Sequence, residues 1–392
     1  VSHWLIFLFA GLSYDYFLSI CRHLLNASQL YIPAILFFAF PTLIAQTVFL
    51  SSDIIFICFF LGALNSYLHA RYRVAYILLS LILLISLRAV PLIIAFYITL
   101  QIVRYSTILN ALKITAQFIA IATPWIAWNI YHYVQTGWII YNTNSIWSAH
   151  RSLLTLSGIA MQTGAFFFRL CEYGFVLVWF LLLQNIKKSC ANTSQKFLWT
   201  LLSAWLFCFF LLSVPFNNPI SNRYLLPAYV CGLLLLSAIL AQCTAIKKNL
   251  LLLVFSLTML ASHFYIYPER FVKAAGYSWD CTLAALPYFN QLAPQIQHYI
   301  QTSADFSNGK TVMAGMPAYQ STEFSHLSVA NTNTIQQLTD NTHLSGDYFI
   351  YSNIMNDIAW EQSQELLKSW VLIYAIKAGS IYIQVYQRPL LQ

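Results

Sequence analysis

Long apolar segments recur along the first two thirds of this 392-residue sequence, and few charged residues interrupt them. Only 8% of all residues are charged and 59% are hydrophobic, whereas soluble globular domains contain roughly 25% charged residues. Helices satisfy their own backbone polar groups inside a bilayer, and the apolar runs lack the alternation of strands. The sequence therefore predicts an all-α polytopic membrane domain. It excludes a single water-soluble domain, a disordered chain and a short-period repeat array.

Hydropathy predicts about ten spans in residues 1–267. The expected spans are 3–21, 31–50, 53–69, 73–88, 89–105, 112–133, 163–185, 197–214, 224–242 and 249–267. Residues 268–392 lack such runs and contain nine acidic residues. Segments rich in β-branched and aromatic residues predict strands at 310–314, 347–351, 370–374 and 381–386, beside a helix at 283–300. We therefore expect a small C-terminal α/β accessory domain after the transmembrane domain.

Basic residues are concentrated in alternate connections between the predicted spans. They are Arg22, Arg71, Arg73, Arg104, Lys113, Lys187, Lys188, Lys196, Lys247 and Lys248. If the spans alternate in direction, all these connections lie on one side, which the positive-inside rule makes cytoplasmic. The C-terminal domain is then expected on the outer side, and the first span runs inward. We expect either an earlier span and outer loop before Val1 or a very short outer N-terminal end.

The basic excess is thus a topology signal and does not indicate nucleic-acid binding. Eight cysteines are scattered without a C-x-x-C pair, and the histidines of the C-terminal region are dispersed. Neither pattern predicts a metal site or a redox motif, so no cofactor is expected.

Several polar residues fall at the predicted outer ends of the spans. They are Asp53, Arg88, Asn129, Arg151 and Arg223. Charged residues in lipid are costly, which favours specific partners for them. Simpler roles stay open, because Asp53 can cap a helix and Arg88 can extend to lipid headgroups. Three arginines among aromatic residues suit the phosphate of a polyprenyl-phosphate-linked sugar, whose tail lies in the bilayer.

Aromatic and amide side chains near the same predicted surface suit sugar stacking and hydrogen bonding to hydroxyl groups. They are Trp125, Asn129, Tyr141 and His150, with Arg151 as the adjoining cation. An interfacial aromatic belt is the alternative interpretation. Further along, Arg169 and Glu172 are three residues apart, which predicts an ion pair between them.

Four segments resemble motifs of the integral-membrane glycosyltransferases of the C-type fold. Arg223-Tyr224-Leu225-Leu226-Pro227 resembles an Arg-Tyr-Leu-Leu-Pro segment of that family. Residues 124–137 are similar to its Pro-Trp-x-x-x-Asn segment, although Trp128 stands where an arginine is common. Residues 41–53 resemble a segment that ends in an outer acid, and Arg88 matches a basic residue that closes the next hairpin. The resemblance is to the bacterial branch of protein mannosyltransferase-like, lipid A aminoarabinose transferase-like and lipopolysaccharide-core galacturonosyltransferase-like enzymes.

This resemblance implies inverting transfer of a sugar from a polyprenyl phosphate to a cell-envelope acceptor, at the periplasmic face of a bacterial inner membrane. Arg88, Arg223 and Tyr224 are expected to bind the donor phosphate, and Asp53 is the candidate catalytic acid. The family's primary acid lies in a first outer loop that this sequence does not contain, so a catalytically inactive scaffold remains an alternative. A lipid-linked glycan transporter is the other alternative, for which Asp15 and the Arg169/Glu172 pair are the sequence indications.

Overall fold

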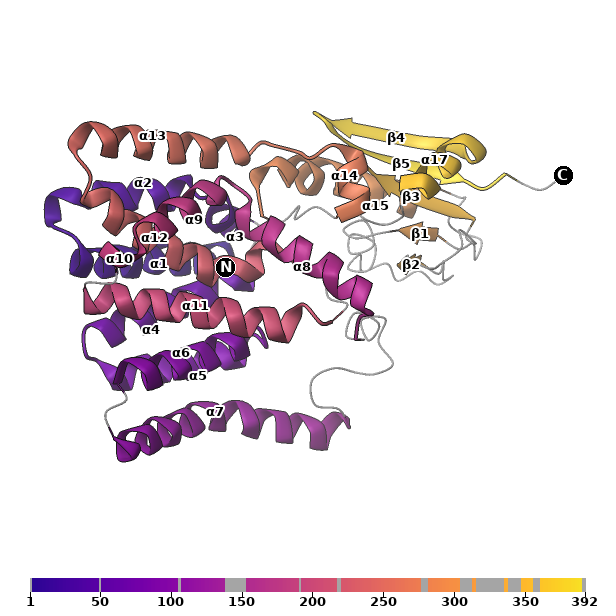
Figure 1. The fold of residues 1–392 in the computed structure, drawn as a ribbon. Helices are drawn as coiled ribbons and strands as arrows, with labels where there is room; N and C mark the ends of the chain where they lie inside the picture. The colour runs from indigo at the N-terminus through magenta and orange to yellow at the C-terminus, as the bar shows by residue number, and fades with distance from the viewer. Residues whose placement is uncertain are drawn as a thin grey trace. The chain divides into compact units, whose positions relative to one another are not determined.

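The chain divides into two compact units, Val1–Ser262 and His263–Gln392. Hydropathy predicts this boundary five residues later, after residue 267. The computed structural model describes residues 2–48, 51–104, 107–137, 153–189, 192–216, 220–275, 281–303, 312–314, 335–337, 347–354 and 360–389. The first unit is helical and the second combines helices with one sheet (Figure 1).

The described helices of the first unit follow the predicted apolar runs. They are α1 (Ser2–Leu24), α2 (Tyr31–Ala39), α3 (Pro41–Val48), α4 (Ser52–Leu68), α5 (Tyr72–Ile85), α6 (Ala89–Arg104), α7 (Ile108–Thr136), α8 (Leu156–Cys171), α9 (Phe175–Gln184), α10 (Ile186–Ser189), α11 (Thr193–Ser213), α12 (Leu226–Ala241) and α13 (Ala245–Ser262). Short 3-10 turns, η1 (Ala27–Gln29) and η3 (Asn222–Leu225), precede α2 and α12. Each predicted span therefore coincides with one helix or with two consecutive helices.

Four of the described helices are long and apolar enough to cross a membrane, or six if each bent helix pair counts as one span. The four are α1, α11, α12 with its preceding turn η3, and α13; the bent pairs are α2–α3 and α8–α9. Helices α4, α5 and α6 are apolar but have only 17, 14 and 16 residues, fewer than the roughly 20 that a straight span needs. The prediction of a mostly helical domain with several candidate membrane spans is confirmed, at this coarser level.

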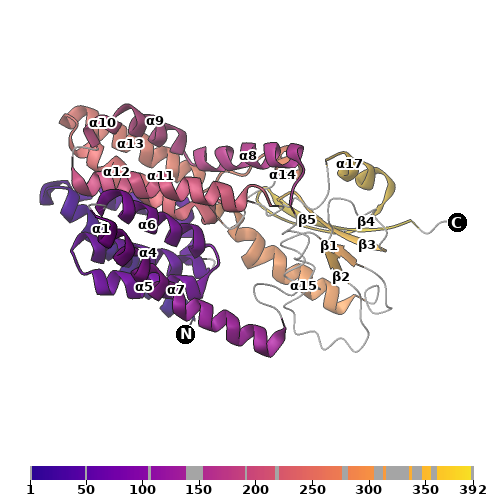
Figure 2. The ribbon, with the colours of Figure 1, turned by 60° about the horizontal axis from the view of Figure 1, so that its bottom comes forward.

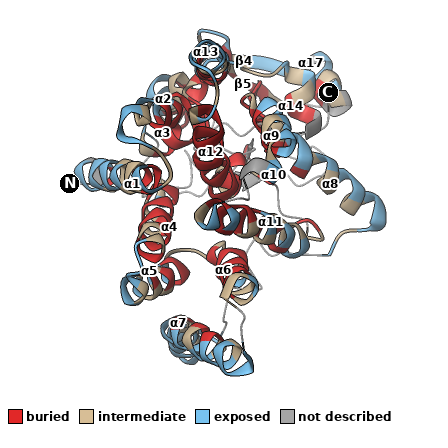
Figure 3. Cartoon of the chain, turned by 60° about the vertical axis from the view of Figure 1, so that its left-hand side comes forward, coloured by how far each residue is buried: buried red, intermediate tan, exposed pale blue. Residues whose placement is uncertain are grey.

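Helix α12 forms the centre of the helical unit. Its residues from Leu226 to Leu240 are all buried, and Figure 3 shows it enclosed by neighbouring helices. A helix that is apolar on every side is expected to be surrounded by protein. Gly232 allows close packing here, because a Cβ at this position would lie 3.0 Å from the Trp179 ring of α9.

Two breaks bend helices that the hydropathy pattern treats as continuous. Helices α2 and α3 meet at 58°, where Pro41 begins α3, and α8 and α9 meet at 84°. Tyr173 and Gly174 between α8 and α9 have φ values of 58° and 82°. A Cβ on Gly174 would also lie 2.6 Å from Thr258. Glycine is therefore required at this turn by both its backbone conformation and its neighbour.

The second unit contains a five-stranded sheet in the order β2-β1-β3-β5-β4. The strands are β1 (Val312–Ala314), β2 (Ile335–Gln337), β3 (Tyr348–Ser352), β4 (Val371–Ala378) and β5 (Ile381–Gln387), with helices α14 (Glu269–Ala275), α15 (Ala293–Thr302) and α17 (Trp360–Ser369). Strand β1 is parallel to β2 and β3, whereas β5 is antiparallel to β3 and β4. The small C-terminal sheet is therefore mixed, and β2 is a strand that the sequence analysis did not predict.

Helices contact both faces of this sheet. Tyr299 of α15 stacks on Tyr374 of β4 with ring centroids 4.0 Å apart, while Glu269 of α14 accepts hydrogen bonds from Tyr351 and Tyr382. The strand register places Tyr374 opposite Val385 and Tyr351 opposite Gln384, so the two contacts lie on opposite faces because adjacent strand residues alternate. Figure 2 shows α15 and α17 on either side of the sheet. The helix predicted at 283–300 is present, and it changes type along its length. It begins as the 3-10 turn η4 (Leu283–Ala285) and the π-helical turn η5 (Tyr288–Leu292) and continues as α15, with Pro294 in its first turn.

Candidate functional site

Asp53 lies at the start of α4, where the local sequence fixes its position. Ser51 is the N-cap residue, and its Oγ accepts a hydrogen bond from the Asp53 backbone N–H at 3.1 Å. The same hydroxyl donates to Asp53 Oδ2 at 3.0 Å. An acidic residue in the first turn also interacts favourably with the helix dipole. The cap of α4 is therefore Ser51 and not Asp53, for which the sequence left a capping role open; Asp53 lies in the first turn, where Ser51 fixes its carboxylate.

Arg88 reaches Asp53 from the connection between α5 and α6. Its Nη1 donates to Asp53 Oδ1 at 2.6 Å, which is a short charge-assisted hydrogen bond. The Arg88 backbone N–H donates to Ser86 Oγ at 3.2 Å, which helps to shape this connection. Arg88 therefore has a specific partner within the protein, the Asp53 carboxylate, and the lipid headgroups are not needed to explain its position.

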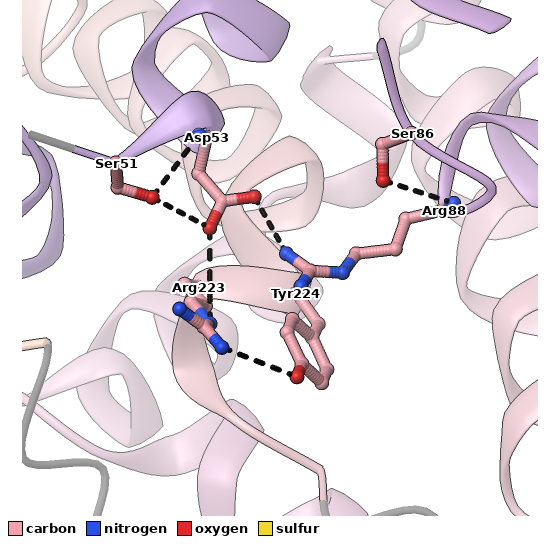
Figure 4. Close-up of polar contacts among 6 residues, drawn as sticks. All are labelled: Ser51, Asp53, Ser86, Arg88, Arg223 and Tyr224. Atoms are coloured by element: carbon pink, nitrogen blue, oxygen red, sulfur yellow. Dashed lines mark hydrogen bonds and ion pairs between the residues drawn. The ribbon is translucent and has the colours of Figure 1, made fainter. Parts of the chain in front are cut away.

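Arg223 approaches the same carboxylate from the turn η3. Its Nε lies 3.7 Å from Asp53 Oδ2. The Tyr224 ring completes the group, because the Arg88 guanidinium carbon lies 3.8 Å from the ring centroid and that of Arg223 lies 5.2 Å away. Figure 4 shows these four residues, Asp53, Arg88, Arg223 and Tyr224, converging from three connections of the chain. We call this group the arginine cluster.

The arginine cluster has a buried acid and partly exposed cations. The side chain of Asp53 is 7% exposed, whereas those of Arg88 and Arg223 are 34% and 28% exposed. One carboxylate faces two guanidinium groups, so the cluster has a formal excess of one positive charge. Guanidinium groups present several N–H donors. Arg223 Nη2 lies 3.4 Å from the Tyr224 hydroxyl, and donors directed away from Asp53 and Tyr224 suit phosphate or carboxylate oxygens. The arrangement is therefore chemically suited to binding an anion.

A second polar network fixes the turn that carries Arg223. Asn222 Nδ2 donates to the Arg169 carbonyl oxygen at 3.3 Å and lies 3.1 Å from the Tyr229 hydroxyl. The Tyr229 hydroxyl also donates to the Arg169 carbonyl. This carbonyl lies in the last turn of α8, where it also accepts the C-cap hydrogen bond from the Glu172 backbone N–H at 3.2 Å. Trp179 Nε1 satisfies the Leu170 carbonyl in the same way, at 2.7 Å.

Arg169 and Glu172 form the predicted ion pair within this network, with Nη1 3.0 and 3.1 Å from the two carboxylate oxygens. A spacing of three residues predicts this pair within one continuous helix. Instead, α8 ends at Cys171 and Glu172 has an extended backbone. Sequence reasoning did not identify Tyr229 or Trp179, although a tyrosine inside the apolar run of α12 is a signal for a buried hydrogen bond.

Several basic connections meet at the opposite ends of these helices. The His23 ring near the end of α1 lies 5.4 Å from the His69 ring, which follows α4, and His23 Nε2 lies 3.1 Å from Ser194 Oγ at the start of α11. Arg104 at the end of α6 lies 4.1 Å from the centroid of the Tyr72 ring at the start of α5. The arginine cluster instead uses the beginnings of α4, α6 and η3. The two groups of charges therefore occupy opposite ends of the helical unit.

The residues predicted to bind sugar or acceptor are not joined to the arginine cluster by any contact among the described residues. Trp125 and Asn129 lie on α7, and Asn129 Nδ2 donates to the Trp125 carbonyl within that helix at 2.7 Å. Tyr141, His150 and Arg151 lie outside the described residues. The sugar-binding and acceptor-binding roles of all five residues stay predictions.

Comparisons of the sequence with protein-family models and with curated proteins, and of the fold with solved structures, find no match. Within the described parts of the chain, no group of three or more histidine, cysteine, aspartate or glutamate side chains is placed to hold a metal ion. The arginine cluster is therefore the candidate functional site.

Proposed function

We propose that this chain is a membrane glycosyltransferase of the C-type fold that takes a sugar from a polyprenyl-phosphate donor. The observation that carries the proposal is the convergence of Arg88, Arg223 and Tyr224 on Asp53. These residues come from separate connections of a chain with few charged residues, and they gather at one end of the helical unit. A lipid-linked phosphate has its charge at the membrane surface and its tail in the bilayer, which suits that location.

The reaction requires stabilisation of negative charge on the departing phosphate. The bond between the anomeric carbon and the phosphate oxygen breaks, and its electron pair remains on that oxygen. The acceptor oxygen or nitrogen forms the new bond to carbon and gives its proton to a general base. A phosphodiester with one negative charge thereby becomes a monoester with a second ionisable oxygen. Arg88 and Arg223 would stabilise this added charge through N–H groups that do not face Asp53.

We assign Asp53 the task of positioning the two arginines. Its Oδ1 accepts from Arg88, and its Oδ2 accepts from Ser51 and faces Arg223. A general base needs a lone pair directed at the incoming acceptor, whereas the Asp53 side chain is only 7% exposed and contacts Ser51, Arg88 and Arg223. The proposed transfer therefore uses another acid as base, as the resemblance to the C-type family implies for its outer loop.

The number of membrane spans and the orientation of the chain are part of the same proposal. We propose ten spans, with the short helices α4, α5 and α6 tilted or in locally thin bilayer. The membrane is a bacterial inner membrane, the basic connections are cytoplasmic, and the C-terminal unit is periplasmic. Opposite placement of the basic connections and the arginine cluster supports this orientation. A transporter would need polar groups along a path through the membrane; the described Arg169 and Glu172 instead neutralise one another inside the protein.

The test measures transfer of a radiolabelled sugar from its polyprenyl phosphate in membranes that contain the protein expressed together with the segment encoded upstream of Val1, where the base is expected. We expect Arg223→Gln to reduce the rate by about 10²–10³-fold, as removal of one charge-stabilising donor does in other enzymes. Arg223→Lys should recover part of the activity, because it keeps the charge and loses the planar geometry. Arg73→Gln is the matched control, since Arg73 is exposed at the opposite end of the helices. Undiminished transfer by Arg223→Gln would refute the site, and absence of transfer by the unmodified protein would refute the function.

A further inference from the structure

Asp15 differs from the other two acidic residues of the helical unit in having no basic partner among the described residues. Residues 1–262 contain only Asp15, Asp53 and Glu172 as acids. Asp53 pairs with Arg88 and Arg223, and Glu172 pairs with Arg169. Asp15 makes no ion pair or hydrogen bond with any residue that the structure describes, and it is exposed on α1.

The position of Asp15 along α1 places it far from both helix ends. It follows Ser2 by 13 residues and precedes Leu24 by nine, which corresponds to about 20 and 14 Å at the rise of an α-helix. Helix α1 is one of the four helices long and apolar enough to cross a membrane. Aspartate has a short side chain that cannot extend over such distances to the headgroups. An exposed carboxylate at this depth would therefore lie against lipid tails unless another protein segment covers it.

The surrounding helix face is shaped for close contact with another helix. Leu8, Gly11, Leu12 and Asp15 are spaced three, one and three residues apart, so they lie on one face of α1. Leu8 is 56% exposed and Leu12 is 37% exposed. A Cβ at Gly11 would meet nothing within 4 Å. Small residues in membrane helices allow two backbones to approach closely, and Figure 3 shows α1 at the edge of the helical unit.

We propose that this face of α1 is the docking surface for a membrane-spanning helix that carries a lysine or arginine at the depth of Asp15. Ionisable residues inside a membrane generally pair with one another, and a basic side chain supplies the missing charge. A second copy of this chain related by two-fold symmetry would place Asp15 against Asp15, which juxtaposes like charges. Cationic lipid headgroups remain at the bilayer surface. Charge complementarity therefore favours a basic helix as the occupant.

The experiment uses a labelled leucine-rich membrane-spanning peptide with one central lysine, mixed with the full chain in phosphatidylethanolamine and phosphatidylglycerol vesicles. Energy transfer between the two labels measures their association. We expect the lysine peptide to associate more strongly than the same peptide with a central leucine. Asp15→Leu should weaken association with the lysine peptide by roughly five- to thirty-fold, the range expected for one polar contact between membrane helices.

Two further variants separate docking from folding. Gly11→Leu should weaken association although Asp15 is intact, whereas Gly164→Leu should not, because Gly164 of α8 has equally open surroundings on another helix. Asp15→Lys should no longer associate with the lysine peptide and should associate with a peptide that has a central glutamate. A misfolded variant would not show this exchange of partners. Equal association of the lysine and leucine peptides would overturn the proposal. Self-association of the chain that depends on Asp15 would also overturn it, because a second copy would then be the occupant.

Discussion

The chemistry of the helical unit depends on a small number of charged side chains whose partners determine what they can do. Asp53 is 5% exposed as a residue and interacts with two arginines and one serine. Removal of its charge would leave Arg88 and Arg223 close to one another without compensation. An amide in its place can accept only one of the present hydrogen bonds well.

We therefore predict that Asp53→Asn destabilises the helical unit by about 1.5–3 kcal/mol, the range for hydrogen bonds to charged groups. Thermal unfolding in detergent, followed by circular dichroism, measures this effect. Asp15→Asn makes the same chemical change at an exposed acid without a described partner, and it should shift the midpoint little. Equal shifts for the two variants would show that the contacts of Asp53 contribute nothing specific.

Two tyrosines of the C-terminal unit, Tyr351 and Tyr382, are expected to make the stability of this unit depend on pH in the alkaline range. Burial raises the pKa of Tyr351 and Tyr382 above the ordinary value of 10.0, and hydrogen bonds to Glu269 raise each pKa further. The folded unit retains these protons at pH values where the unfolded chain has lost them. The associated stability is therefore fully present below pH 10 and declines as the pH rises above it.

We expect the C-terminal unit to unfold at lower denaturant concentration as the pH is raised from 9 to about 11, the interval that spans the ordinary tyrosine pKa of about 10. Near-ultraviolet circular dichroism reports the transition, and absorbance of tyrosinate reports ionisation. Tyr382→Phe should reduce the pH dependence, because phenylalanine has no proton to lose. A slope that is unchanged in this variant would contradict the assignment to Tyr382.

At the level of whole elements, the break between α8 and α9 determines where Arg223 lies. The turn η3 is attached to the end of α8 through Asn222 and Tyr229, both of which contact the Arg169 carbonyl. These two contacts add to the C-cap hydrogen bond that the same carbonyl accepts from the Glu172 backbone N–H. Hydropathy predicts one continuous span over 163–185. It does not predict the bend, because the contacts that stabilise the bend come from distant residues and leave no signal in an apolar run.

Tyr229→Phe removes the hydroxyl that donates to the Arg169 carbonyl while it keeps the ring. We predict destabilisation of about 1–3 kcal/mol, because a buried carbonyl and the Asn222 amide each lose a partner. Thermal unfolding in detergent gives the measurement. Tyr14→Phe is the matched control. The contacts of Tyr14 with Phe37 and Phe38 involve its ring, which phenylalanine keeps. The two variants should differ clearly, and equal stability would argue against a structural role for the Tyr229 hydroxyl.

At the scale of the whole molecule, opposite ends of the helical unit have different charge character. The arginine cluster occupies one end, and His23, His69 and Arg104 belong to the basic connections at the other end. The positive-inside rule predicts that the basic end faces the cytoplasm. If the basic end is cytoplasmic, the arginine cluster is external.

This orientation can be tested with alkaline phosphatase and green fluorescent protein fusions in bacterial cells. Fusions after residue 192 and after residue 244 should be fluorescent, because they follow connections at the basic end. A fusion after Gln392 should instead have phosphatase activity. Cytoplasmic fluorescence from the C-terminal fusion would contradict the external position of both the C-terminal unit and the proposed site.

The sequence by itself determined the helical character of the first unit, the positions of its helices and the scarcity of charges, because hydropathy and helix caps act over short stretches of chain. It also identified Asp53, Arg88 and Arg223 as residues in need of partners. Only the tertiary structure decided that these three meet one another, that Trp125 and Asn129 have no described contact with them, and that the chain bends between α8 and α9 at Gly174. Partner choice depends on packing between distant segments, and no local pattern of residues encodes that packing.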